Sequence, residues 1–235
     1  MDVSVVVPLS IEKCEYRKRI WEFIRKKWET TYPNWKIVIG ECNNCEDGWR
    51  KGVAVFDGVS KTDSEFIIVA DADVWVSNLH KYINKNSKVV KPNRAVYRLT
   101  EYASELVLSG KHDINKLWKE KSMLLEKPYR QVFGGGLLFL RRDIYIDIPI
   151  DPRFCGWGKE DSSWGLALKT LVEKGNIGRG QSPLIHLYHP PEPRVKRNKA
   201  FEHNEEIYSE YKQAYKDIKK MSDIMKNVGG INNAI

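Results

Sequence analysis

Short apolar runs alternate with helical patterns through the first third of the chain. Val3–Val7 and Phe66–Ala70 are continuous apolar runs, and Ile37–Ile39 is a shorter one. Runs of this length predict buried strands. Helical spacing recurs between the first two runs, at Ile20, Phe23, Ile24 and Trp28. With a second helix expected within residues 47–61, the order strand, helix, strand, helix, strand predicts an α/β domain with a parallel sheet.

The rest of the chain carries weaker patterns. Residues 81–93 are mostly polar, residues 96–99 suggest a strand, and Leu137–Leu140 is an apolar run that follows three glycines. Apolar residues at helical spacing predict a helix that starts near Ser162 and one late amphipathic helix over residues 201–225. Residues 227–235 are expected to form a frayed tail.

Three predicted strands end in polar segments. Pro8–Ser10 follows the first strand, Gly40–Asn44 the second, and Asp71–Asp73 the third. Ligands of parallel sheets bind beyond the carboxyl ends of the strands, so we expect these segments to line one crevice. No GxGxxG or GxxxxGK[ST] motif follows a strand, which argues against dehydrogenase and P-loop functions.

Composition limits the class of protein. The 235 residues are 42% apolar and 30% charged, which fits one globular domain, and no run approaches the roughly 20 residues of a membrane-spanning helix. We therefore expect a cytoplasmic protein, and we expect the four cysteines to be ordinary thiols rather than a disulfide framework. The net charge of +8 predicts attraction to an anion, such as a nucleotide diphosphate, an acidic glycan, a lipid head group or a nucleic acid.

Two segments offer metal ligands. Asp71 and Asp73 flank one residue at a strand end, so both carboxylates can face the crevice and offer hard oxygen ligands to Mn²⁺ or Mg²⁺. His186 and His189 lie on a segment followed by two prolines, where one or both imidazoles can complete the coordination. Solvated strand-end acids and structural histidines are the competing interpretations.

A second pair of acids follows a glycine-rich segment. Asp161 is the candidate general base, because an inverting transfer needs a carboxylate that removes the proton of the acceptor hydroxyl, and Glu160 would orient the acceptor. Trp157 lies between two glycines and suits stacking against a sugar, and Gly134–Gly136 permits close approach of the backbone to a ligand. Helix-start acids, a packing tryptophan and a glycine bulge are the structural alternatives.

Taken together, these motifs resemble GT-A glycosyltransferases. The motifs are the DxD at Asp71–Asp73, the FGG at Phe133–Gly135 and the GWGxED at Gly156–Asp161. Over most of residues 3–205, the amino-terminal half is similar to family 2 and the carboxyl-terminal half to the β-1,4-galactosyltransferase group. The resemblance implies a GT-A fold, with a Rossmann-like nucleotide-binding sheet flanked by helices. It also implies one domain with a nucleotide-sugar half (1–100), an acceptor half (101–205) and a C-terminal helix and tail (206–235).

The resemblance also implies roles at matching positions. Asp73 would ligate Mn²⁺ or Mg²⁺, His186-x-x-His189 would be the second metal segment, and Asp161 would be the base. Asp71 would lie at the metal, the ribose or the donor sugar.

Other matching positions concern the nucleotide and the acceptor. Pro8 and Glu41 would line the nucleotide pocket, with Gly135 and Trp157 near the donor. Glu41 stands where family 2 members usually have aspartate. Ser162 and Ser163 replace acids that often follow the ED pair, which leaves the acceptor open.

We therefore expect an inverting, metal-dependent transfer of a hexose or N-acetylhexosamine from a UDP-sugar to an acceptor hydroxyl, on a glycan, a glycolipid or a modified nucleic-acid base. A basic nucleic-acid-binding protein is the alternative, motivated by the charge and by the basic run at residues 194–199. A nucleotidyltransferase that uses the DxD metal is a weaker one.

Overall fold

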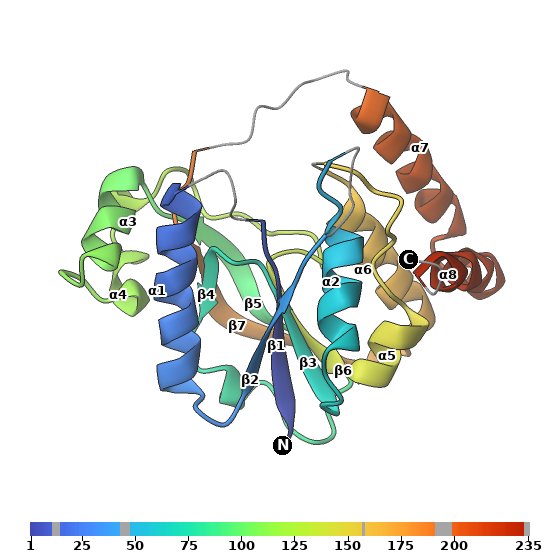
Figure 1. The fold of residues 1–235 in the computed structure, drawn as a ribbon, viewed down its shortest axis with the longest axis horizontal. Coiled ribbons are helices and arrows are strands. Elements are labelled where there is room, and N and C mark those ends of the chain that lie inside the picture. The colour runs from blue at the N-terminus through green and yellow to red at the C-terminus, as the bar shows by residue number, and fades with distance from the viewer. Residues whose placement is uncertain (11–14, 43–47, 157, 191–198, 233–235) are drawn as a thin grey trace.

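The computed structural model describes residues 1–10, 15–42, 48–156, 158–190 and 199–232. Seven strands form one sheet, and helices cover both of its faces (Figure 1). The strands are β1 (Val3–Pro8), β2 (Lys36–Gly40), β3 (Phe66–Ala70), β4 (Val74–Val76), β5 (Val89–Arg98), β6 (Leu137–Arg141) and β7 (Ile177–His186). The α-helices are α1 (Glu15–Thr31), α2 (Lys51–Ser60), α3 (Glu101–Leu108), α4 (Ile114–Leu117), α5 (Arg142–Asp147), α6 (Glu160–Leu171), α7 (Lys199–Ala214) and α8 (Ile218–Asn232). The short 3-10 helices are η1 (Leu79–Lys81), η2 (Lys121–Met123) and η3 (Lys174–Asn176).

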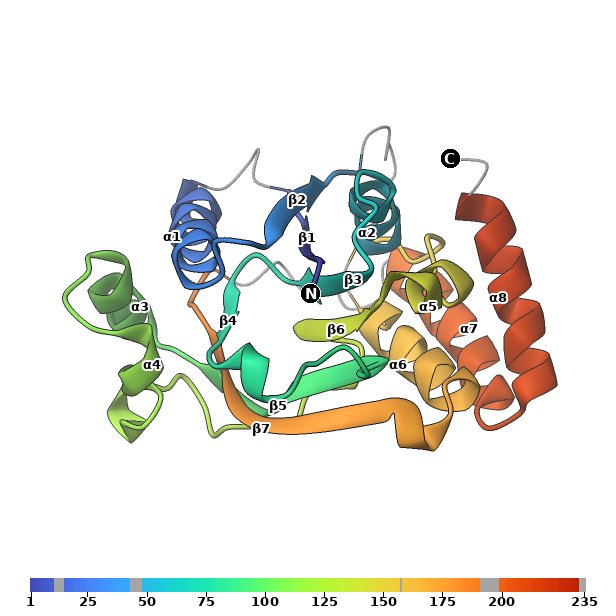
Figure 2. The ribbon, with the colours of Figure 1, turned by 90° about the horizontal axis from the view of Figure 1, so that it is seen from below.

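The strand order is β2-β1-β3-β6-β5-β7-β4. The pairs β1–β2, β1–β3 and β5–β7 are parallel, whereas β6 runs antiparallel to both β3 and β5, and β4 runs antiparallel to β7. The prediction of a parallel sheet is therefore confirmed for the first three strands only. Seen from below, the sheet curls, so that β7 passes beneath β5 and β6 and carries β4 at its far edge (Figure 2).

Each face of the sheet has its own apolar core, because side chains alternate along the strands. Val3, Val5 and Val7 of β1 point into one core, with the buried faces of α1, α3 and α4. Val6 points into the other core, with residues of α2, α5, α6, α7 and α8. The sheet is thus the middle layer of three, which is the layering of an α/β domain.

The carboxyl-terminal part departs from the sequence predictions. The expected single late helix is two helices, which are separated at Lys216, whose φ is +70°. Tyr215 and Ile218 are among the apolar residues whose helical spacing predicted the single helix, but they are 40% and 66% exposed. The break lets α7 and α8 both pack against α6. The predicted tail is also wrong, because α8 continues to Asn232.

Two further expectations concern cysteines and membranes. Cys155 is buried and is not part of a disulfide, but Cys42 is disulfide-bonded, so the expectation of ordinary thiols is wrong for Cys42. Within the described residues, no helix is long and apolar enough to span a bilayer.

Candidate functional site

The polar residues of interest lie at one edge of the sheet. β1, β2, β3, β5 and β7 all run in the same direction, so their carboxyl ends lie at this edge, and the antiparallel strands β4 and β6 begin there. Asp71 and Asp73 connect β3 to β4, Gly136 precedes β6, and His186 ends β7. The Asp71 N–H donates to the Gly136 carbonyl at 2.8 Å. This hydrogen bond joins the DxD segment to Gly134–Gly136, which we call the glycine segment.

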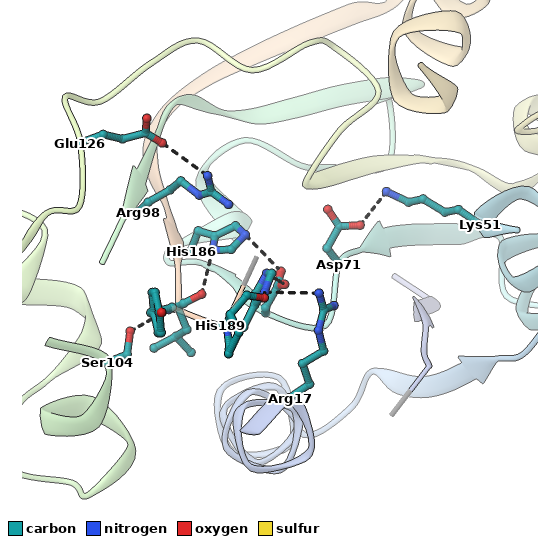
Figure 3. Close-up of polar contacts among 12 residues, drawn as sticks. Arg17, Lys51, Asp71, Arg98, Ser104, Glu126, His186 and His189 are labelled. Atoms are coloured by element: carbon teal, nitrogen blue, oxygen red, sulfur yellow. Dashed lines mark hydrogen bonds and ion pairs between the residues drawn. The ribbon is translucent and has the colours of Figure 1, made fainter. Parts of the chain in front are cut away.

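Asp73, His186 and His189 form a cluster with the geometry of a metal site. One ligand atom from each side chain lies within 4.8 Å of the other two. His189 Nε2 is 3.1 Å from Asp73 Oδ2, and His186 Nε2 is 3.8 Å from Asp73 Oδ1. The three side chains are only 10–16% exposed. We refer to these three residues as the Asp–His cluster; Figure 3 shows the two histidines beside Arg17 of α1.

Backbone carbonyls orient both imidazoles of the Asp–His cluster. Nδ1 of His186 is 2.7 Å from the Leu187 carbonyl, and Nδ1 of His189 is 2.9 Å from the Pro190 carbonyl. Because a carbonyl can only accept, each contact implies the tautomer with a hydrogen on Nδ1, although at His189 an Arg17 guanidinium nitrogen also lies 3.3 Å from Nδ1. In both residues Nε2 faces Asp73. This arrangement, in which the other ring nitrogen is held by a carbonyl, is the usual support of a metal-binding histidine.

The charges of the cluster depend on one another. Burial disfavours the charged carboxylate of Asp73, but His186, His189 and Arg17 outweigh it and lower the pKa of Asp73. Burial lowers the pKa of His186, which favours the neutral imidazole that binds metals. Burial also acts on His189, but the hydrogen bond and charge of Asp73 outweigh it, so its pKa is raised.

Lys51 connects the DxD segment to the predicted base. Its Nζ lies 2.6 Å from Asp71 Oδ1 and 2.9 Å from Asp161 Oδ1, and its side chain is 12% exposed. Burial would lower the pKa of Lys51, but Asp161 and Asp71 outweigh it and raise this pKa well above the usual value. Burial raises the pKa of Asp71, and Lys51 counteracts this effect. The ammonium group of Lys51 thus forms ion pairs with two carboxylates, one directly after β3 and one in the first turn of α6.

The glycine segment packs tightly against the start of α6. A helix start next to Glu160 and Asp161 was predicted at this position. A Cβ atom on Gly135 would lie 2.7 Å from Asp161 Oδ2, and one on Gly134 would lie 3.1 Å from the Gly165 nitrogen. Gly136 has φ +73°, a conformation that side chains disfavour. The absence of side chains at these glycines lets the Asp161 carboxylate lie against the backbone between β3 and β6.

Two side chains form hydrogen bonds with the backbone of the glycine segment. Lys91 of β5 is buried and its Nζ donates to the Gly135 carbonyl. Gln131, with its amide oriented so that both ends are satisfied, donates to the same carbonyl at 3.1 Å and accepts from the Gly136 N–H at 3.2 Å. Burial lowers the pKa of Lys91 to about 8, against the opposing effect of Asp161 and Asp71. Lys91 is therefore a second cation, besides Lys51, that interacts electrostatically with the carboxylates of Asp71 and Asp161.

Glu160 lies in the first turn of α6, next to Asp161. Burial and the charge of Asp161 raise its pKa to about 7. At neutral pH the Glu160 carboxyl is therefore partly protonated, and it can donate as well as accept a hydrogen bond.

Other predicted site residues lie at the edge or outside the described part. Pro8 ends β1, and the next residue donates its N–H to the Gly40 carbonyl at 3.0 Å. The Glu41 side chain is 56% exposed and lies 3.9 Å from Lys61, while its backbone N–H donates to Asp57 at 2.8 Å. Trp157 and residues 194–198 of the basic run lie outside the described residues.

Comparison with known proteins gives a structural likeness only. No family model matches the sequence, and no curated protein matches it. The structure resembles a mutant Drosophila β-1,4-galactosyltransferase 7 in complex with manganese, UDP-Gal and xylobiose, with a TM-score of 0.52 and 13% identity over 86% of this chain and 79% of that chain. It also resembles mannosyl-3-phosphoglycerate synthase from Rubrobacter xylanophilus, with a TM-score of 0.51 and 14% identity over 98% of this chain and 75% of that chain.

Both proteins are GT-A glycosyltransferases. This chain has the GT-A fold. The fold prediction is therefore confirmed. Within the GT-A fold, the Asp–His cluster, the Lys51 bridge and the glycine segment occupy the edge where β3 and β7 end.

Lys51, Lys91 and Gln131 were not predicted as site residues from the sequence. Lys51 follows a polar segment without a motif, and Lys91 lies at the end of the polar stretch from which no strand was predicted. Gln131 stands two residues before the FGG motif, so its proximity to that motif was the only available signal.

Proposed function

We propose that the chain is an inverting, metal-dependent glycosyltransferase that moves a hexose or N-acetylhexosamine from a UDP-sugar to an acceptor hydroxyl. The observation that carries this proposal is the shared edge of the sheet, where the Asp–His cluster and Asp161 are joined through Asp71 and Lys51. A cation site and a carboxylate base are the two groups that such a transfer needs. UDP-sugars and manganese in the galactosyltransferase of similar fold support the choice of donor and metal.

The Asp–His cluster is the proposed site for Mn²⁺ or Mg²⁺. The ligand set is one carboxylate oxygen and two imidazole nitrogens. The carboxylate suits Mn²⁺ or Mg²⁺, and because imidazoles are ligands of transition-metal ions rather than of Mg²⁺, we propose Mn²⁺ as the preferred ion of the two. When bound, the ion would neutralise negative charge that develops on the leaving diphosphate. Asp71 is proposed to lie at the ribose or the donor sugar, with Pro8 and Glu41 toward the nucleotide and Gly135 toward the donor.

Asp161 is the proposed general base. Its carboxylate would accept the proton of the acceptor hydroxyl while the hydroxyl oxygen forms a bond to the anomeric carbon, and UDP leaves with the electron pair of the broken bond. Lys51 holds Oδ1 at 2.9 Å and so fixes the carboxylate, and Glu160 is proposed to orient the acceptor. In this proposal residues 1–100 hold the nucleotide sugar, and residues 101–205 hold the acceptor.

Release of UDP tests the proposal. The protein is incubated with UDP-galactose, UDP-N-acetylgalactosamine or UDP-glucose and Mn²⁺, with and without acceptor sugars, and UDP is measured. Asp161→Asn should lower turnover by about 10²- to 10⁴-fold and leave UDP binding intact. Asp143→Asn, whose side chain is 59% exposed, is the control and should keep full turnover. Normal turnover in Asp161→Asn, or turnover that persists after chelation of the metal, would refute the mechanism.

A further inference from the structure

A cavity of about 510 Å³ lies away from the Asp–His cluster. Its walls come from the carboxyl-terminal half of α1, the β4–η1 connection, α4 and the middle of β7. The volume falls within the range of roughly 300–1,000 Å³ that is typical of small-molecule sites. We call it the α1–α4 pocket.

The α1–α4 pocket is separate from the proposed transfer site. The residues that line it do not include Asp73, His186, His189 or Asp161. Trp75 and Pro183 in its wall are two and three residues from Asp73 and His186 along β4 and β7, which at a rise of about 3.3 Å per residue is roughly 7–10 Å. A ligand in the pocket would therefore not occupy the position of the metal or of Asp161.

The charge of the pocket is positive. Lys27 and Lys119 line it, and among the residues that the structure describes no aspartate or glutamate does. Neither lysine forms an ion pair with any residue that the structure describes. Lys27 Nζ is 5.7 Å from the centre of the Trp75 ring, and Lys119 Nζ is 5.7 Å from the centre of the Trp118 ring. Two ammonium groups that line the pocket thus remain available to an anion.

The aromatic side chains of the pocket are held in place by internal hydrogen bonds. Trp75 Nε1 donates to Asn115 Oδ1 at 3.1 Å, and Trp118 Nε1 donates to the Asn115 carbonyl at 2.8 Å. The Tyr82 hydroxyl lies 3.3 Å from Ser182 Oγ. Trp75 is buried at the base, whereas Trp118 and Tyr82 are partly exposed. The pocket therefore has a fixed aromatic lining surrounded by amide and hydroxyl groups.

We propose that the α1–α4 pocket binds a saccharide that carries an anionic group, either a carboxylate or a phosphate. Partly exposed aromatic rings suit the apolar face of a sugar ring, and the amides and hydroxyls suit its hydroxyl groups. The two lysines supply the charge that selects an anionic sugar over a neutral one. This binding site goes beyond the transfer reaction and does not depend on it.

Binding can be followed at the tryptophans without measuring activity. The indole N–H signals of Trp75 and Trp118 are assigned in ¹H–¹⁵N NMR spectra of the full chain. Each signal is identified by its absence from the spectrum of the corresponding variant, Trp75→Phe or Trp118→Phe. Glucuronate, glucose 6-phosphate, glucose and inorganic phosphate are then titrated. We expect glucuronate or glucose 6-phosphate, or both, to shift these two signals at concentrations at least tenfold lower than glucose or phosphate alone. A response to glucuronate identifies a carboxylate as the anionic group, and a response to glucose 6-phosphate identifies a phosphate.

A matched pair of double variants tests the role of the lysines. Lys27→Met with Lys119→Met should weaken binding of the anionic sugar at least tenfold. Lys26→Met with Lys116→Met removes the same charge from α1 and α4 at exposed positions outside the pocket and should leave binding unchanged. UDP release should be equal in both double variants, because neither touches the transfer site.

Four results would overturn the proposal. Glucose could bind as tightly as its 6-phosphate and as glucuronate, or phosphate alone could bind as tightly as the anionic sugars. The two double variants could bind equally well. A single-stranded oligonucleotide could displace the sugars at lower concentration and require the same two lysines, which would indicate a nucleic-acid site. None of these results depends on whether the chain transfers sugars, so failure here and failure of the proposed function are distinguishable.

Discussion

Replacement of Lys51 by methionine tests the internal organisation of the site. Methionine keeps most of the length of the side chain and removes its charge. Lys51 is the only described cation within 4 Å of the carboxylates of Asp71 and Asp161, at 2.6 and 2.9 Å. Without the ammonium group, two carboxylates with exposed fractions of 28% and 19% would face each other across the same small space.

The size of the effect follows from burial. Loss of one partner from a buried ion pair costs about 3–5 kcal/mol, and two like charges about 4 Å apart repel by about 4 kcal/mol at an intermediate dielectric constant. Because these side chains retain some contact with solvent, we take about 3 kcal/mol as the expected loss in the free energy of unfolding at pH 8. This loss should be smaller at pH 5. Burial already raises the pKa of Asp71, and without Lys51 this pKa rises further, so that a larger share of Asp71 is protonated at pH 5 than at pH 8 and the repulsion is weaker there.

Urea denaturation followed by circular dichroism at pH 5 and pH 8 measures both quantities. The matched control is Lys61→Met at the end of the same helix, which breaks a 2.6 Å ion pair with Asp57 whose lysine is 43% exposed. This exposed pair should contribute about 0.5 kcal/mol or less at either pH. The explanation is wrong if Lys51→Met costs no more than Lys61→Met at pH 8, or if its cost is the same at both pH values.

Two further predictions concern the glycine segment and the helix start. Gly135→Ala places a methyl group 2.7 Å from Asp161 Oδ2, so it should displace the carboxylate and lower the rate of UDP release by about 10- to 100-fold. The control is Gly175→Ala, which should be neutral because no atom lies within 4 Å of its new methyl group. Equal rates of UDP release in the two variants would contradict this prediction. Because the pKa of Glu160 is raised to about 7 from 4.5, the folded state holds a proton that the unfolded state releases, so this residue's contribution to stability is complete below about pH 4.5 and is lost as the pH rises through 7. Glu160→Gln should therefore remove part of the fall in the free energy of unfolding between pH 5 and pH 8, and an unchanged pH dependence would argue against a raised pKa.

Much of the amino-terminal half of the fold could be predicted, because its strands are continuous apolar runs that end in polar residues. β1 and β3 were predicted within one residue of the observed bounds, and the helix that starts at Glu160 was expected there. These elements are specified by local patterns. The same patterns place Asp71 and Asp73 at a strand end, independently of any contact with the rest of the chain.

The elements that the sequence did not reveal depend on distant partners. β5 was expected only over residues 96–99, although it begins at Val89, because Lys91, Pro92 and Asn93 interrupt its apolar pattern. Its pairing with β6 and β7 compensates for that interruption. The Lys51 bridge is similar, since its two carboxylates are 20 and 110 positions away in the sequence. The helix break at Lys216 also follows from packing against α6, which the continuous apolar stripe does not show.

The proposed function requires that a divalent cation at the Asp–His cluster holds the diphosphate of the donor. Calorimetric titration of UDP into the wild-type protein and into Asp73→Asn, with Mn²⁺ or with a chelator, tests it most directly. We predict that Mn²⁺ tightens UDP binding to the wild type by about 10- to 100-fold and has little effect on the variant, which should remain folded by circular dichroism. Equal UDP affinity with Mn²⁺ and with the chelator, or an undiminished effect of Mn²⁺ on the variant, would contradict the claim.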